Sequence, residues 1–89
     1  MKARYTDSFK YDYKNLPIQT QEQINKQIRL LLKNPHHPSL HTKKMEGEKG
    51  KKGIWEGRIT KGIRFSFKIE KDTYILRRVG PHNKVLKQP

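Results

Sequence analysis

The apolar residues change their spacing partway along this chain, and no other feature constrains the fold as strongly. Ile24, Ile28, Leu31 and Leu32 recur at helical intervals, which predicts one apolar stripe along a helix. In residues 63–69 the apolar side chains alternate with polar ones instead, as they do in a strand with one buried face. Helical residues therefore come first and strands come last, which predicts an α+β fold.

Two helices are expected before the Asn34-Pro35 pair, because the residue before a proline is unfavourable in a helix. The first helix is expected to begin at Asp7 or Ser8, since either side chain is a suitable N-cap. Thr20 and Gln23 fit a capping box at the start of the second helix, in which each side chain binds a free backbone N–H of the other residue. Together the two helices form an αα-hairpin.

The remaining regular structure is expected to be β. Strands are predicted over residues 2–6, 54–60, 63–69 and 74–79. The Lys61-Gly62 pair gives a tight hairpin between two of them, and residues 82–86 are left as a short tail. We expect the αα-hairpin to pack on a small, twisted antiparallel sheet, within one domain that spans residues 1–89.

Alternation in these strands divides their side chains between two faces. Phe65 and Phe67 are expected to face the core, which places Arg64 on the opposite face. The same period allows only one of Arg77 and Arg78 to reach that opposite, working face, and we favour Arg78.

The charge of the chain indicates its kind of partner. Lys and Arg number 21 against 8 Asp and Glu, which gives a net charge of +13 and a pI of about 10.2. A surplus of this size repels itself in a compact fold, so a polyanionic partner is expected, and nucleic acid is the usual one. Residues 35–89 carry +9 of this charge against +4 for residues 1–34, so the binding face is expected in the second half.

Several classes of protein are excluded by what the sequence lacks. It has no cysteine, which removes disulfides, thiolate zinc sites and a cysteine nucleophile. Residues 1–5 hold no secretion signal, and the apolar run at residues 30–32 is too short to span a bilayer, so a soluble, cytoplasmic protein without a membrane partner is expected. His36, His37 and His41 have no carboxylate at ligand spacing, so neither a metal nor another cofactor is expected. His41 is considered instead as an additional base.

Three segments, taken in their order and spacing, resemble the RelE/ParE toxin superfamily. They are Leu31-Leu32-Lys33-Asn34-Pro35, then Trp55-Glu56-Gly57-Arg58-Ile59-Thr60-Lys61-Gly62-Ile63-Arg64, and finally Leu76-Arg77-Arg78-Val79-Gly80-Pro81-His82. The resemblance covers roughly residues 5–86. It implies a RelE-like fold and a toxin of a type II toxin–antitoxin module, which acts as a ribosome-dependent, metal-independent mRNA endonuclease and so inhibits translation. The partners it implies are a cognate antitoxin, the ribosome and mRNA.

The resemblance also implies a chemistry, in which the 2′-hydroxyl of the RNA attacks the neighbouring phosphate. Arg64 matches the hairpin arginine of the family and would neutralise the phosphate, because a guanidinium binds two phosphate oxygens at once. Arg78 matches a second catalytic arginine found in some members. His82 matches a histidine or basic group after the last strand, and it would protonate the leaving oxygen or take the 2′-proton. The side chains expected to bind RNA are Lys43, Lys44, Lys51, Lys52 and Arg58.

The sequence departs from the family pattern at two positions. Leu86 stands where many active members carry an aromatic residue that stacks on a base, and no acid lies near Ser39, where some relatives have a glutamate base. Two other functions therefore stay open: a non-catalytic ParE-type toxin that poisons gyrase, and a basic RNA- or ribosome-binding module. Trp55 is interpreted as a core residue, with base stacking as the alternative. Residues 46–53, rich in lysine and glycine, are expected to form a basic loop.

Overall fold

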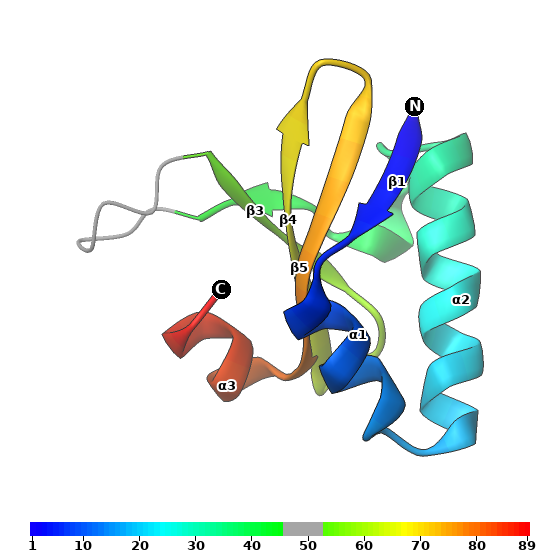
Figure 1. Cartoon of the computed structure of the whole chain (residues 1–89). Helices are drawn as coiled ribbons and strands as arrows, with labels where there is room; N and C mark the ends of the chain where they lie inside the picture. Colours follow the sequence, from blue (N-terminus) through cyan, green and yellow to red (C-terminus); the bar gives the residue numbers. More distant parts are fainter. Residues whose placement is uncertain (46–52) are drawn as a thin grey trace.

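A computed structural model gives the structure of the chain and describes residues 1–45 and 53–89. The expected α+β fold is confirmed, because two N-terminal helices pack against one sheet (Figure 1). Nearly all of the predicted basic loop, with Lys51 and Lys52, lies outside the described residues. No helix in the two described ranges is long and apolar enough to cross a membrane.

The elements follow one another from a short strand to a short helix. They are β1 (Lys2–Tyr5), α1 (Asp7–Lys14), α2 (Ile18–Lys33), a 3₁₀ turn (Pro38–Leu40), β2 (Lys43–Lys44), β3 (Ile54–Arg58), β4 (Ile63–Glu70), β5 (Thr73–Pro81) and α3 (His82–Lys87). The five strands form one sheet in the order β1-β5-β4-β3-β2. Four of them pair antiparallel as predicted, but β1 pairs parallel with β5. No hairpin joins β1 to β5, since both helices and three strands lie between them, so nothing local imposes an antiparallel pairing.

The helices begin at residues other than those predicted. The N-cap of α1 is Thr6, whose hydroxyl accepts a hydrogen bond from the Phe9 N–H at 3.1 Å, and not Asp7 or Ser8. Helix α2 begins at Ile18, so Thr20 lies inside its first turn and the predicted capping box is wrong. The helix begins without a capping box. Pro17 is its N-cap, and the Pro17 carbonyl accepts the first helical hydrogen bond, from the Gln21 N–H.

Short elements after α2 depart from the prediction. Helix α2 ends at Lys33 with Asn34 as its C-cap, as predicted. No helix or strand was predicted between residues 35 and 53, yet this stretch contains the 3₁₀ turn and the two-residue strand β2. At the other end, β5 continues to Pro81 and residues 82–87 form α3 where a tail was expected. Such short elements hold too few residues to establish a period, so the sequence pattern could not indicate them.

The main core lies between α2 and the sheet. Phe65 and Phe67 stack with ring centroids 5.5 Å apart and are fully buried, together with Leu31 of α2. Trp55 stacks on Phe67 at 6.3 Å and packs against this core, which confirms its interpretation as a core residue. Gly57 lies flat against the Phe65 ring, where an added Cβ would come within 2.3 Å of a ring carbon. The strand needs glycine at that position for the ring to pack.

A β-bulge interrupts the pairing of β4 with β5. Ser66 is opposite Arg78 and Phe67 is opposite Leu76, so Arg77 is the additional residue. Leu76 and Val79 both belong to the core. The predicted strict alternation of β5 is therefore wrong beyond Leu76, because the bulge shifts it by one position.

Candidate functional site

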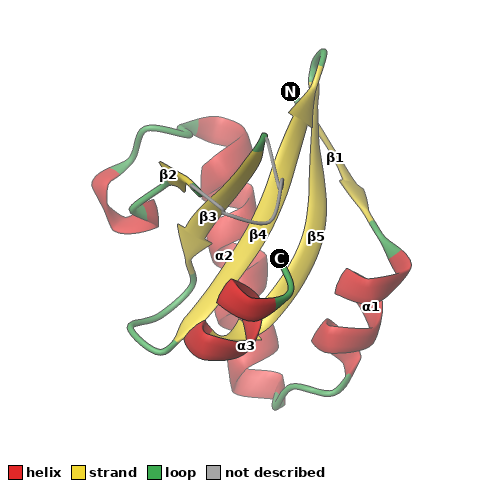
Figure 2. Ribbon diagram, turned by 90° about the vertical axis from the view of Figure 1, so that its left-hand side faces the viewer, coloured by secondary structure: helices red, strands yellow, loops and turns green. Residues whose placement is uncertain are grey.

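The sheet face opposite α2 carries most of the polar side chains of the strands. Figure 2 shows α3 and the end of the chain in front of this face, with α2 behind the sheet. Period-two alternation places Glu56, Arg64 and Ser66 here, since Phe65, Phe67 and their partners face the core. We call this surface the charged face.

Glu56 lies at the centre of the charged face, and three basic groups surround it. Its Oε1 is 3.3 Å from Arg64 Nε and 3.5 Å from His82 Nε2, while its Oε2 is 4.0 Å from Lys43 Nζ. The Glu56 side chain is only 4% exposed. Burial of a carboxylate costs free energy unless partners compensate it, so Glu56 depends on these basic groups and fixes their positions.

The basic groups around Glu56 differ in how far they reach the surface. The Arg64 side chain is 13% exposed, and its Nη1 also donates to the backbone carbonyls of Thr60 and Lys61 in the β3–β4 turn. His82 is 41% exposed and Lys43 is 69% exposed. Arg64 is therefore held from both sides, whereas His82 and Lys43 are open to an arriving molecule.

Strand pairing and the start of α3 bring these residues together. Lys43 of β2 is opposite Glu56 of β3, and Arg64 of β4 is opposite Gly80 of β5. His82 follows two residues later, and its backbone N–H donates to the Gly62 carbonyl at 3.0 Å. His82 is thus held by its backbone N–H and by ring atom Nε2, which leaves ring atom Nδ1 for proton exchange.

Two arginines lie directly opposite each other beside this cluster. Arg58 of β3 pairs with Arg64 of β4, although like charges opposite each other destabilise a sheet. Within the described part of the chain, Arg58 Nε is buried and makes no hydrogen bond. Gln27 of α2 holds the Arg58 backbone by donating to its carbonyl at 2.9 Å. Two like charges at this position make the neighbouring surface strongly basic, which favours an anionic partner.

A hollow of about 330 Å³ adjoins the carboxylate. It is lined by Lys43, Lys44, Met45, Glu56 and Leu86. Glu56 Oε2 makes no hydrogen bond to any of the described residues. Leu86 and Met45 provide an apolar wall and the lysines a basic one, so the hollow offers apolar contacts and positive charge side by side.

The structure brings together some of the predicted site residues and separates others. Arg64 and His82 share one carboxylate oxygen, and Lys43 and Arg58 lie beside them. Lys44 lines the adjoining hollow. Arg78 lies outside this cluster, two strands away from Glu56 in the sheet.

Arg78 is held by an aspartate of α1. Its Nε and Nη2 donate to the two carboxylate oxygens of Asp12 at 2.7 and 3.0 Å, and the Val79 N–H donates to the same group at 3.1 Å. The hydrogen bond to Asp12 raises the pKa of Arg78 above its usual value. This clamp fastens α1 to β5, so the guanidinium has fewer donors left for a ligand.

Glu56 is the site residue that the sequence reasoning missed. Two signals were available: an acid inside a strand of a strongly basic chain, and its position two residues before Arg58 on the same face. What the sequence could not give was the contact with His82, because that depends on how α3 begins. Among the residues the structure describes, no three His, Asp or Glu side chains gather as metal ligands would.

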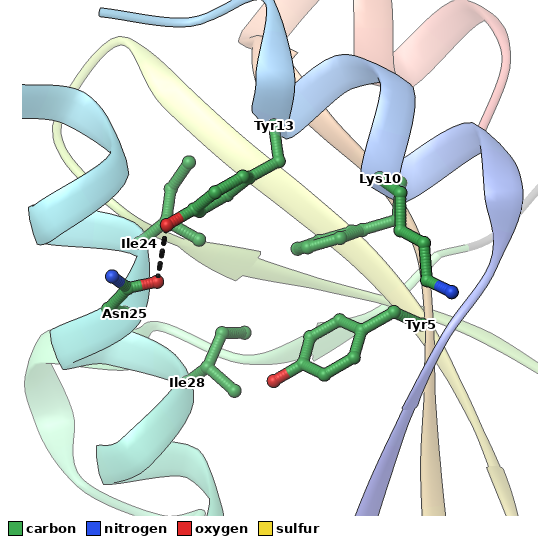
Figure 3. A pocket seen from close by; sticks show the side chains of 7 residues that line it. Tyr5, Lys10, Tyr13, Ile24, Asn25 and Ile28 are labelled. Carbon is green, nitrogen blue, oxygen red and sulfur yellow. Dashed lines mark hydrogen bonds between the residues drawn. The ribbon is translucent and has the colours of Figure 1, made fainter. Parts of the chain in front are cut away.

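A second hollow lies on the other side of the molecule, between α1, α2 and β1. It measures about 230 Å³, and Figure 3 shows Tyr5, Lys10, Tyr13 and Ile28 around it. The Tyr13 hydroxyl donates to Asn25 at 2.9 Å across its rim. Burial, with a smaller contribution from Tyr13, raises the pKa of Tyr5. This hollow is mainly apolar and has no acid–base pair, so it does not resemble a catalytic site.

Comparison with known proteins identifies the fold. No protein-family model and no curated protein sequence matches the chain. Among solved structures, YafQ from E. coli strain BL21(DE3) has a TM-score of 0.77 and 15% identity, with 93% of this chain and 94% of YafQ covered. A YoeB/ParE toxin from Agrobacterium tumefaciens has a TM-score of 0.74 and 24% identity, with 92% and 99% covered. A chain of the RelB–RelE antitoxin–toxin complex from Methanococcus jannaschii has 0.71 and 22%, with 96% and 98% covered. The protein has the fold of the RelE, YoeB and YafQ toxins, as the sequence motifs implied.

Proposed function

We propose that this protein is the toxin of a type II toxin–antitoxin module and that it cuts mRNA on the ribosome, in the cytoplasm, without a metal. The observation that carries the proposal is the buried carboxylate of Glu56, whose Oε1 lies within 3.5 Å of both Arg64 and His82. An imidazole and a guanidinium fixed next to each other on a basic surface are the groups that RNA transesterification requires.

The reaction is an in-line displacement at phosphorus. The 2′-oxygen of one nucleotide forms a bond to the neighbouring phosphorus as its proton leaves to water, and the bond to the 5′-oxygen of the next nucleotide breaks. His82 gives a proton from Nδ1 to that departing 5′-oxygen. The products are a 2′,3′-cyclic phosphate and a free 5′-hydroxyl.

The neighbouring basic side chains stabilise the charge on the phosphate. Arg58 and Arg64 lie across from each other at one end of the cluster, and Lys43 lies at the other. Fixed cations near a developing negative charge lower the barrier because they need no rearrangement during the reaction. Glu56 acts as a positioning residue, since its Oε1 orients both His82 and Arg64.

An acidic antitoxin segment is the partner we propose for the basic surface when the toxin is silent. The similar RelE chain was solved as an antitoxin–toxin complex, and the net charge of +13 favours an acidic partner. Such a segment would cover the charged face and exclude RNA. Leu86 lines the hollow where other members have an aromatic residue, so we expect base stacking to contribute little here.

The test compares three proteins in a translating extract: the wild type, His82→Ala, and His36→Ala as a matched control. His36 is an exposed histidine in the turn after α2, so its loss removes an imidazole without touching the cluster. We expect the wild type and His36→Ala to produce new 5′-hydroxyl ends at fixed positions within codons of a reporter mRNA. Loss of general acid catalysis should slow His82→Ala by about 10²- to 10⁴-fold.

Other outcomes would reject the proposal in different ways. If mRNA stays intact with all three proteins, expression of the wild type in growing cells separates the two alternatives. Growth arrest with blocked DNA replication would favour the gyrase-poisoning alternative. Normal growth would leave a basic RNA-binding module. Cleavage by His82→Ala at the rate of the control would remove His82 from the chemistry.

A further inference from the structure

The bulge in β5 directs two consecutive arginines toward the same side of the sheet. In a regular strand Arg77 and Arg78 would face opposite sides. Here Arg77 is the additional residue of the bulge, and both side chains line one polar hollow of about 390 Å³. The other residues that line it are Thr6, Ser8, Gln88 and Pro89. The prediction that only one of the two arginines reaches the working face is therefore wrong.

The two guanidinium groups play different parts in this hollow. Asp12 compensates the charge of Arg78 and fixes its orientation through two hydrogen bonds. Arg77 donates from Nε to the Pro89 carbonyl at 3.1 Å. No side-chain carboxylate in residues 1–45 or 53–89 lies within ion-pair distance of Arg77. Arg77 is thus engaged at Nε by the Pro89 backbone oxygen, while its Nη groups make no hydrogen bond to the described residues and remain as donors.

The surroundings suit an anion with several oxygen atoms. The exposed Ser8 hydroxyl lies on the rim and is a further donor. The hollow is open to solvent and its lining is mostly polar. An arginine binds a phosphate through two parallel hydrogen bonds, so the ends of Arg77 and Arg78 with a nearby hydroxyl form a phosphate-binding arrangement.

We propose that this hollow, which we call the bulge site, binds a phosphodiester group of single-stranded RNA at a distance from the bond that is cut. The proposal rests on the proposed function for its choice of RNA. Glu56, Ser66 and Arg78 lie in one row across β3, β4 and β5, and adjacent strands are about 4.8 Å apart. The bulge site is thus about 10 Å from the Glu56 backbone, so its phosphate belongs to a different nucleotide from the one that reacts.

The test measures affinity without cleavage. A short single-stranded RNA with 2′-O-methyl groups cannot be cut, because it lacks the attacking hydroxyl. Its dissociation constant is measured against salt concentration for the wild type, Arg77→Gln, Ser8→Glu and Arg29→Gln. Arg29 is an exposed arginine of α2, so Arg29→Gln removes the same charge away from the bulge site. Thermal unfolding of each variant checks the fold.

We expect Arg77→Gln to weaken binding about tenfold. The logarithm of the association constant should also fall less steeply with the logarithm of salt concentration, the magnitude of the slope being smaller by about 0.7. Arg29→Gln should change neither by a comparable amount. Ser8→Glu adds a negative charge at the rim and should also weaken binding, while an acid in the first turn of α1 leaves stability equal or higher. This variant therefore separates loss of binding from loss of folding.

Two results would overturn the bulge site. Equal affinities and salt slopes for Arg77→Gln and Arg29→Gln would show that only the total charge matters. A normal affinity for Ser8→Glu would place the effect of Arg77 outside the hollow. Because the RNA is not cut, both results are independent of whether the protein is a nuclease.

Repeating the measurement with intact ribosomes identifies the source of the phosphate. Weaker binding of Arg77→Gln to both the short RNA and the ribosome assigns the site to the single-stranded message. Loss on the short RNA alone assigns it to RNA that the ribosome does not present. On a substrate that can be cut, the proposal requires a higher KM and an unchanged kcat for Arg77→Gln, since Arg77 does not contact the reacting atoms.

Discussion

The two faces of the sheet use the same strands for opposite purposes. The face toward α2 holds Phe65, Phe67 and Leu76, all almost completely buried. The charged face places one buried carboxylate, Glu56, among basic side chains, and it leaves a buried Arg58 nitrogen without a hydrogen bond within the described residues. The first arrangement lowers the free energy of the folded state, while the second raises it unless an anion binds. Stability and activity should therefore respond separately to substitutions on the two faces.

The largest effect on stability is expected on the α2 side. Phe65→Ala removes a fully buried ring that contacts both Gly57 and Phe67, so the free energy of unfolding should fall by about 3–5 kcal/mol. This loss is comparable to the whole stability of a small domain. Urea unfolding followed by Trp55 fluorescence measures it. Ile69→Ala, at a half-exposed position on the same face of the same strand, is the control, and an equal loss there would show that burial of the Phe65 ring does not set the cost.

A smaller effect is expected at the clamp between α1 and β5. Asp12→Asn leaves the Arg78 guanidinium without its counter-charge and should cost about 2–3 kcal/mol. This is less than the 3–5 of a fully buried pair, because the Arg78 side chain is 24% exposed. The exposed Asp7→Asn variant should change stability by only about 0.3–1 kcal/mol. Cleavage at saturating RNA should be retained in Asp12→Asn, and a loss as large as that of His82→Ala would make Arg78 part of the chemistry.

Glu56→Gln sharpens the comparison, because it tests function and stability together on the charged face. The amide keeps the shape of the side chain but removes the counter-charge of Arg64, which is only 13% exposed, so the free energy of unfolding should fall by about 2–3 kcal/mol, as for Asp12→Asn. Cleavage should fall by about ten- to a hundredfold, since His82 and Arg64 lose the charge that orients them. Glu70→Gln, at the exposed end of β4, is the matched control. Cleavage that survives in Glu56→Gln at the control rate would remove its positioning role.

The smallest effect concerns alkaline pH on the core side. Burial raises the pKa of Tyr74 above its ordinary value of 10.0, so the folded state favours the neutral phenol. Its contribution to stability is complete below about pH 10 and is lost as the pH rises above that value. Unfolding free energies at several pH values from 8 to 11 should therefore decline less steeply for Tyr74→Phe than for the wild type. Identical slopes would exclude Tyr74 as a contributor.

The long elements of the fold were predictable from the sequence, and the short ones were not. The α2 stripe and the alternation in β4 each repeat over several turns or residue pairs, so they establish a period. β2, α3 and the bulge at Arg77 contain too few residues for that. Sequence motifs indicated Arg64 and His82, but not that both contact Glu56, which requires the packing of β3, β4 and α3 to be known.

The parallel pairing of β1 with β5 has a consequence for how the protein is made. Thr6, just after β1, donates its hydroxyl hydrogen to the Arg77 carbonyl, across 71 positions of the chain. Contacts of such large sequence separation form late in folding, because the intervening chain must first close a long loop. A chain that emerges from the ribosome cannot complete its sheet until β5 has been synthesised. His82 comes directly after β5, so its contact with Glu56 cannot form before that strand has been synthesised.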